Sequence, residues 1–296
     1  MFDLKRMIII FMFFAVPSLS AAVEKPIVTV SILPQKHFVE KIAGDLLEVH
    51  VMVAPGASPA TYEPDPSQIL QLARSQVYFS IGVPFEKAWL PQLARTYPGL
   101  QVVATDEGLE KRPIAGHHHH HDGHGHGKKH KHDAGFPDPH VWLSPELVLH
   151  QIHVIHGVLK EKFPAFAKDF DEGYGAFVQE VRDTDREIRS ILAGRDGGSF
   201  FVFHPSWGYF AHDYGLEQIP VEVGGREPTP GELARMIRMA RDKNASVVFI
   251  QPQFSDRAAR IIAESVQAKV VTLDPLAENW RENLLKAARA MEEYVR

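Results

Sequence analysis

The sequence contains no cysteine among its 296 residues. This absence excludes disulfide bonds, thiolate metal ligands, a cysteine nucleophile and a lipid-modified cysteine. An excess of basic charge is also missing, because 32 lysines and arginines stand against 37 acidic residues and give a net charge of -5. The only basic cluster, Lys128, Lys129 and Lys131, lies within a histidine-rich run. We therefore expect no nucleic-acid partner.

Long hydrophobic runs are absent as well, apart from one near the start of the chain. Lys5 and Arg6 precede the apolar run MIIIFMFFAV, and small residues follow it in PSLSAA. The run is about half as long as the roughly 20 residues that a membrane helix needs. This pattern predicts a signal peptide over residues 1–22, cleaved after Ser20 or Ala22, rather than an uncleaved anchor. We expect the mature protein to be soluble and to lie outside the cytoplasm, in the periplasm.

The apolar residues that follow gather in short β-branched runs separated by helical patterns. Strands are predicted over residues 27–33, 47–53, 77–83, 101–105, 200–203, 217–223, 247–250 and 269–273. Helices are predicted over His37–Ala43, Pro66–Ser75, Glu86–Tyr97, Pro145–Phe163, Pro230–Lys243, Asp256–Val266 and Asn279–Arg296. Alternation of strands and helices is typical of parallel sheets covered by helices on both faces.

One long segment breaks this alternation. Residues 164–194 contain no strand pattern, and their aromatic and aliphatic residues fall near a helical stripe. Gly173 and Gly175 oppose a helix there, each by about 1 kcal/mol relative to alanine. We expect an α/β fold of two lobes, each a four-stranded, mostly parallel sheet with flanking helices, joined by one long helix. The predicted divisions are residues 23–163, the linking helix over 164–194, and residues 195–296.

Three polar residues stand where a parallel sheet binds its ligands, beyond the carboxyl ends of strands or just before a helix. His204 follows the predicted strand 200–203, Asp274 follows the strand 269–273, and His140 precedes the helix that begins at Pro145. Alone, each has an ordinary structural explanation as a helix cap or turn residue. Together they supply two imidazoles and one carboxylate, a set that suits a divalent first-row metal, with zinc favoured. Glu222 and Glu227 flank a glycine pair and are candidates to hydrogen-bond the ligating imidazoles.

Histidine is concentrated in one internal segment, HHHHHDGHGHGKKHKH, over residues 117–132. The segment has no apolar side chain, so a disordered surface loop is its expected structure. We predict weak, multivalent metal capture that assists a tight site elsewhere; the alternative is a polar insertion without a role. The candidate auxiliary ligands are His117, His118, His119, His120, His121, His124, His126, His130 and His132.

Several motifs in order resemble the ZnuA-like substrate-binding proteins of zinc and manganese ABC importers. They are FVEKIAGD (38–45), TYEPDPSQI (61–69), the histidine-rich insertion, DPHVWLSP (138–145), FHPSWGYFAHDYGL (203–216), GREPTPGEL (225–233), IQPQFS (250–255) and LDPLAENW (273–280). The resemblance implies two lobes with metal in the cleft between them, lobe closure on the metal, and His140, His204 and Asp274 as the family's second, third and fourth ligands. It also implies a monomer that gives Zn(II) to an ABC permease and its ATPase. Histidine at 204, where manganese binders tend to have a carboxylate, favours zinc over Mn(II).

The chain departs from this family at the first ligand, where Ala60 stands in place of the expected histidine. The candidate replacements are His37, which is preferred because it follows the first strand, then Glu63, a water, or a histidine of the 117–132 segment. Two other functions stay open. One is a periplasmic zinc buffer or chaperone that uses the histidine-rich loop, and the other is a zinc hydrolase. The hydrolase is disfavoured because the sequence has no H-E-x-x-H motif, and we expect no enzymatic activity and no catalytic residues.

Overall fold

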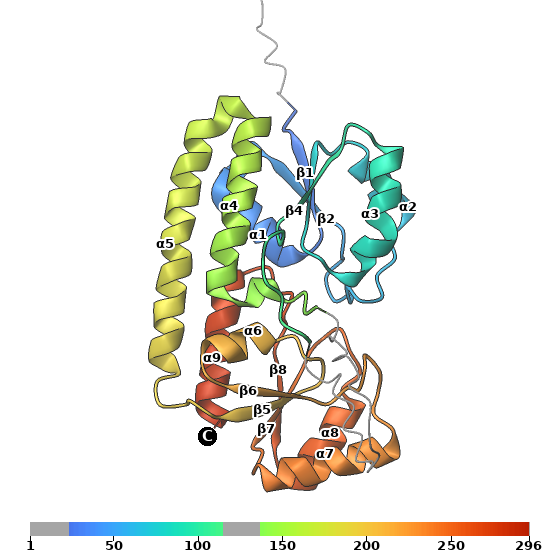
Figure 1. Ribbon diagram of the computed structural model, residues 1–296, viewed down its shortest axis with the longest axis vertical. Helices are drawn as coiled ribbons and strands as arrows, with labels where there is room; N and C mark the ends of the chain where they lie inside the picture. The colour runs from blue at the N-terminus through green and yellow to red at the C-terminus, as the bar shows by residue number, and fades with distance from the viewer. Residues whose placement is uncertain (1–23, 115–136, 296) are drawn as a thin grey trace, which may run out of the picture.

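The computed structural model describes residues 24–114 and 137–295. The expected signal peptide over residues 1–22 and the nine histidines of the 117–132 segment lie outside the described residues. The described chain forms two lobes stacked along the long axis of the molecule, with two long helices along one side (Figure 1).

The first lobe is built on a parallel sheet in the order β2-β1-β3-β4. The sequence order of its strands reverses between β1 and β3, so the carboxyl ends of these two strands border a crevice suited to a ligand. Its strands are β1 (Ile27–Val30), β2 (Glu48–Val51), β3 (Val77–Ser80) and β4 (Gln101–Ala104). Its helices are α1 (Leu33–Ala43), the short η1 (Gly44–Leu46), α2 (Pro66–Leu72) and α3 (Pro84–Thr96).

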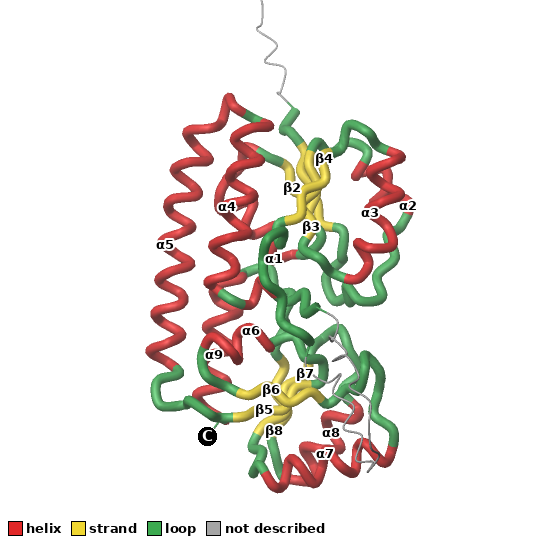
Figure 2. Tube along the Cα trace, in the orientation of Figure 1, coloured by secondary structure: helices red, strands yellow, loops and turns green. Residues whose placement is uncertain are grey.

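The second lobe repeats this plan with a parallel sheet in the order β6-β5-β7-β8. Figure 2 shows both sheets in yellow with red helices beside them. Its strands are β5 (Ser199–Val202), β6 (Glu217–Pro220), β7 (Val247–Ile250) and β8 (Lys269–Thr272). Its helices are α6 (Gly208–Asp213), α7 (Pro230–Asp242), α8 (Arg257–Val266) and α9 (Trp280–Tyr294). The expected α/β fold of two four-stranded parallel sheets is thus confirmed.

A pair of long helices connects the lobes. The chain passes through η2 (Val141–Leu143), α4 (Pro145–Lys162) and η3 (Pro164–Phe166) into α5 (Ala167–Ile191), whose 25 residues run beside both lobes (Figure 1). Gly173 lies within α5 without interrupting it. A side chain at this position would collide with the carbonyl oxygen of Ile42 in α1. The glycine that weakens the helix in sequence is what lets α1 pack directly on the α5 backbone.

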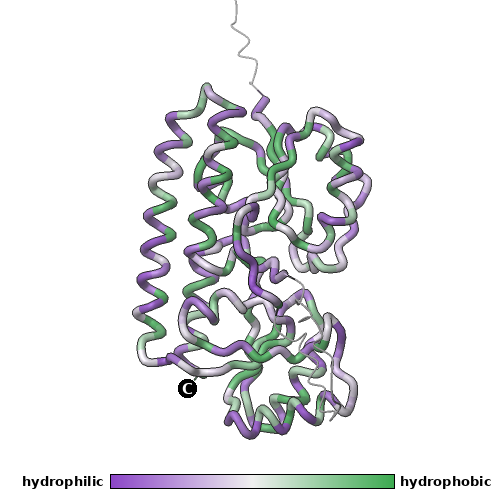
Figure 3. The backbone as a smooth tube through the Cα atoms, viewed as in Figure 1, coloured by the Kyte–Doolittle hydropathy of each residue, from purple (hydrophilic) through white to green (hydrophobic). Residues whose placement is uncertain are grey.

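The apolar core is continuous from one lobe to the other. One cluster of buried residues joins the first sheet, α4, α5 and α9 to one face of the second sheet, where Phe200 and Val202 of β5 point. A smaller cluster under α7 and α8 contains Phe201 and Phe203, from the opposite face of that sheet. The strands of both sheets are correspondingly apolar in Figure 3. Among the described helices, none has the length and apolar character to cross a membrane.

Candidate metal site

A cavity of about 440 Å³ lies between the two lobes. Ser58, Ala60 and Lys87 line it from the first lobe, and His204, Glu222 and Phe254 line it from the second. His140 and Trp142, from the segment that leads into α4, form part of the same wall. The cavity therefore brings together His140, His204 and Ala60, the residue that stands in place of the expected first histidine ligand.

His140 is held in one orientation by a neighbouring carboxylate. Its Nδ1 donates to Oδ1 of Asp138 over 2.6 Å, and its backbone N–H donates to the same oxygen over 3.0 Å. The hydroxyl of Tyr209 donates to the Asp138 carbonyl, which ties this turn to α6. Burial lowers the pKa of His140, although the Asp138 carboxylate opposes the shift. The imidazole is therefore neutral near pH 7, with its lone pair on Nε2.

His204 is oriented in a similar way from the second lobe. Its Nδ1 donates to Oε1 of Glu222 over 2.9 Å, and its ring stacks on Phe254 with centroids 4.6 Å apart. Gln251 fixes the backbone, since its side chain accepts from the His204 N–H and donates to the His204 carbonyl. The expected hydrogen bond between Glu222 and a candidate ligand is thus present, with Glu222 as the acceptor.

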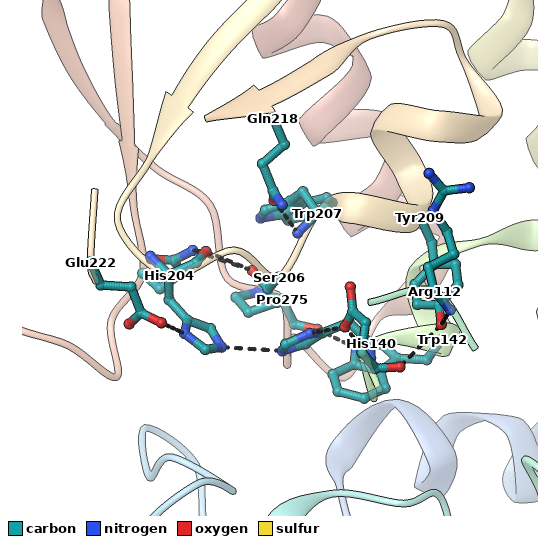
Figure 4. Close-up of polar contacts among 12 residues, drawn as sticks. Arg112, His140, Trp142, His204, Ser206, Trp207, Tyr209, Gln218, Glu222 and Pro275 are labelled. Atoms are coloured by element: carbon teal, nitrogen blue, oxygen red, sulfur yellow. Dashed lines mark hydrogen bonds and ion pairs between the residues drawn. The ribbon is translucent and has the colours of Figure 1, made fainter. Parts of the chain in front are cut away.

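The two imidazoles face each other across the lobes, as Figure 4 shows. Their Nε2 atoms are 3.3 Å apart. In a tetrahedral zinc site with Zn–N bonds of about 2.0–2.1 Å, two nitrogen ligands stand about 3.3–3.4 Å apart. Because both Nδ1 atoms donate to carboxylates, both Nε2 lone pairs are available for one ion between them. The pair therefore has the spacing and the tautomers of two ligands to a single zinc.

Asp274 lies next to this pair without joining it. Its Oδ1 accepts from Nε2 of Gln253 over 2.7 Å and from the backbone N–H of Leu276 over 2.9 Å. Gln253, Pro275 and Leu276 line the main cavity, whereas Asp274 lines a separate small one of about 40 Å³ beside the first lobe. The structure thus places the Asp274 carboxylate behind the wall of the main cavity.

His37 is not brought to the pair, in contrast to the position expected from the sequence. Strand β1 ends at Val30 and α1 already begins at Leu33, so His37 stands in the second helical turn instead of directly after the strand. Its ring packs 5.8 Å from that of Phe177 in α5. Burial, the largest cause, lowers its pKa to about 4. This environment is that of a packed core histidine.

Among the described residues, the other candidate replacement, Glu63, supplies no ligand in this arrangement. Glu63 is exposed and does not line the cavity, while Ala60 lines it with a methyl group. Within residues 24–114 and 137–295, no group of three or more histidine, aspartate or glutamate side chains is placed to hold a metal ion. The two facing imidazoles are accordingly the centre of the candidate site.

Asp138 is a site residue that the sequence reasoning missed. It stands two residues before His140 in DPH, and this spacing lets one carboxylate oxygen accept from both the ring and the backbone of the histidine. The described residues nearest to the histidine-rich segment also border the site, since Ile114 and Pro137 line the cavity and Pro113 pairs with Pro137.

Comparison with known proteins agrees with this architecture. A family model described as "Zinc-uptake complex component A periplasmic" matches residues 28–294. The high-affinity zinc uptake system protein ZnuA of Bacillus subtilis is 26% identical over 251 residues, which are 84% of this chain and 78% of the relative. The zinc-binding protein AdcA of Streptococcus pyogenes is 25% identical over 271 residues, or 88% of this chain and 52% of AdcA, so this chain spans about half of that relative.

Solved structures give the same result. A crystal structure of ZnuA has a TM-score of 0.82 and 36% sequence identity, and the match covers 92% of this chain and 99% of that one. The Zn(II)-bound ZnuA-like domain of Streptococcus pneumoniae AdcA has a TM-score of 0.73 at 20% identity, covering 92% and 99% of the two chains, and shows the fold alone. With the family model matched over nearly the whole chain, these likenesses confirm the resemblance found in the sequence, and the protein belongs to the ZnuA family of zinc-uptake components.

Proposed function

We propose that this chain binds Zn(II) in the periplasm and delivers it to an ABC permease driven by its ATPase. The observation that carries the proposal is the facing pair of Nε2 atoms, 3.3 Å apart, each left free by a carboxylate on the opposite ring nitrogen. The family description, with its zinc-uptake relatives, supports the transport role. His140 and His204 are the proposed protein ligands.

Zinc is favoured over Mn(II) by the character of the available donors. Nitrogen ligands suit zinc, whereas manganese prefers sites rich in oxygen. Here the two metal-donor atoms facing one another belong to imidazoles, and one oxygen each of Asp138 and Glu222 accepts a hydrogen bond from those rings. We retain Asp274 as a further candidate ligand; its Oδ1 accepts a hydrogen bond from Gln253, a residue that lines the cavity.

Metal titration of His140→Ala and His204→Ala tests the ligand assignment. Each substitution removes one of two protein donors, so we expect zinc affinity, measured by competition with a chromophoric chelator, to fall at least 100-fold. His212→Ala is the matched control, because His212 is exposed on α6 and does not line the cavity. Unchanged zinc affinity in both ligand variants would sink the proposed site.

Deletion of the histidine-rich segment distinguishes the proposed importer function from that of a zinc buffer. If residues 117–132 formed the main store, their deletion would abolish tight zinc binding. The importer proposal expects one tight zinc equivalent to survive that deletion while weaker equivalents are lost. Isothermal titration of the shortened protein decides between the two, and loss of the tight equivalent would favour the buffer.

A further inference from the structure

Within residues 24–114 and 137–295, the protein offers fewer metal ligands than a zinc ion takes. Tetrahedral zinc has four ligands, and a closed site fills all four positions from the protein. Among the described residues that line the cavity, His140 and His204 are the two imidazoles, and their Nε2 atoms face each other. Ala60 lines the cavity with a methyl group, and Oδ1 of Asp274 is held by Gln253 and Leu276. The described imidazoles thus account for two of the four positions and leave two for other donors.

That space is far larger than an ion or a water molecule requires. The cavity measures about 440 Å³, whereas one water occupies roughly 30 Å³ in the liquid. Pockets for small organic ligands begin at about 300 Å³ and are mostly apolar with a few polar groups. The wall here has that character, since Pro59, Pro84, Trp142, Phe254 and Leu276 surround the imidazole pair.

One cation borders the space opposite the imidazoles. Lys87 is the only lysine or arginine among the described residues that line the cavity. Among the described residues that line the cavity, Glu222 is the one carboxylate, and its Oε1 accepts a hydrogen bond from His204. A ligand with carboxylate groups would meet the ammonium of Lys87 on one side and the metal on the other.

The lobes are also fastened beneath the cavity, so the space is not simply a gap that closes on the ion. The indole of Trp142 donates to the carbonyl of Pro275, and the indole of Trp280 donates to the carbonyl of Trp142, both over 2.7 Å. An ion pair between Lys36 of α1 and Glu278 adds a third link between the lobes. These contacts fix the two walls that Trp142 and Pro275 form.

We propose that the cavity receives zinc together with a small anionic chelator, an organic molecule that bears carboxylates with an amine or hydroxyl donor. The chelator fills the coordination positions beside Ala60, and its free carboxylate pairs with Lys87. This inference rests on the proposed zinc-binding function and names a ternary complex of protein, metal and chelator as its cargo. An amino acid and a hydroxy acid share the required chemistry.

Equilibrium dialysis of the full chain with zinc and a radiolabelled chelator tests the proposal. L-Histidine and citrate serve as separate probes, one for each chelator class, and each is dialysed with and without zinc. We expect about one equivalent of label to be retained with one of the two probes, and only when zinc is present. Retention of zinc without either label would overturn the chelator proposal and leave the zinc function intact. Retention of neither zinc nor label would refute the zinc function itself.

Three variants locate the chelator. Ala60→His supplies the missing imidazole and fills its space, so we expect label retention to fall at least tenfold while zinc stays bound. Lys87→Ala removes the counter-charge and should weaken label retention about tenfold. Lys168→Ala is the control, because Lys168 is exposed on α5 and away from the cavity, and label retention should not change. Equal retention by Ala60→His and the unmodified chain would overturn the assignment of the chelator to this cavity.

Discussion

Replacement of His37 by leucine should make the protein less sensitive to acid. The His37 ring packs on Phe177 and Phe38, and its Nε2 is buried without a hydrogen-bond partner among the described residues. Burial lowers the pKa of this histidine from 6.5 to about 4. The unfolded chain therefore takes up a proton before the folded one does, and stability decreases as the pH falls from about 6.5 to about 4.

The magnitude follows from the pKa shift. One pKa unit corresponds to about 1.4 kcal/mol, so the full shift of this histidine corresponds to about 3 kcal/mol. His37 is only partly buried, and solvent screening reduces this figure. Between pH 7.5 and pH 5 we expect the free energy of unfolding to fall by about 1–2 kcal/mol more in the unmodified protein than in His37→Leu. Leucine also fills the apolar contact with Phe177.

Urea unfolding of the metal-free protein, followed by tryptophan fluorescence at both pH values, measures this difference. The unmodified chain and His212→Leu are the references, because His212 is exposed and its loss leaves the acid response in place. An equal loss of stability in His37→Leu and the unmodified chain would refute the placement of His37 in a packed interior. Zinc affinity provides a second readout: it should not change in His37→Leu, and a fall of tenfold or more would return His37 to the metal site.

Other predictions concern the carboxylates and the core. Asp138→Asn and Glu222→Gln should each lower zinc affinity about 10- to 100-fold, the usual cost of losing a partner of a ligating histidine, as measured by chelator competition; unchanged affinity in both would show that these carboxylates do not orient the ligands. Glu86→Ala removes the acceptor for the buried N–H groups of Ile81 and Gly82, and urea unfolding should show a loss of about 2–4 kcal/mol; a loss below 1 kcal/mol would contradict this role. Phe177→Ala empties a site between α1, α5 and α9 and should cost about 3–5 kcal/mol, seen as a lower melting temperature, whereas an unchanged one would count against that packing.

The fold could be predicted because its signals are local. The central strands β1, β3, β5 and β7 are short, buried apolar runs. The alternation of strands with helices leaves few alternatives to parallel sheets. His204 could be placed for the same reason, since β5 ends at Val202 and the histidine follows at the edge of the sheet. Its partner Glu222 could be anticipated as well, because β6 ends two residues earlier, at Pro220, beside β5.

The surroundings of His37 and Asp274 depend on features of a different kind. The position of His37 depends on where α1 begins, and four residues separate the expected start from the observed one at Leu33. A helix turns by about 100° per residue, so a shift of this kind changes the element that a side chain contacts. The position of Asp274 depends on a hydrogen bond from Gln253, which is distant in sequence. Neither the register of a helix start nor a long-range side-chain contact is visible in local patterns.

The two lobes share buried structure, and this limits how they move when metal is captured. Trp142 and Trp280 are each 1% exposed where the lobes meet. An aromatic side chain buries about 150–250 Å², so separating the lobes would expose roughly 300–500 Å² from these two residues alone. At about 25 cal/mol per Å², that exposure costs on the order of 10 kcal/mol. A nanomolar ligand has a total binding free energy of only about 12 kcal/mol. If His140 and His204 hold zinc as proposed, we expect the ion to enter and leave chiefly through movement of the cavity walls around them, while the shared core stays closed.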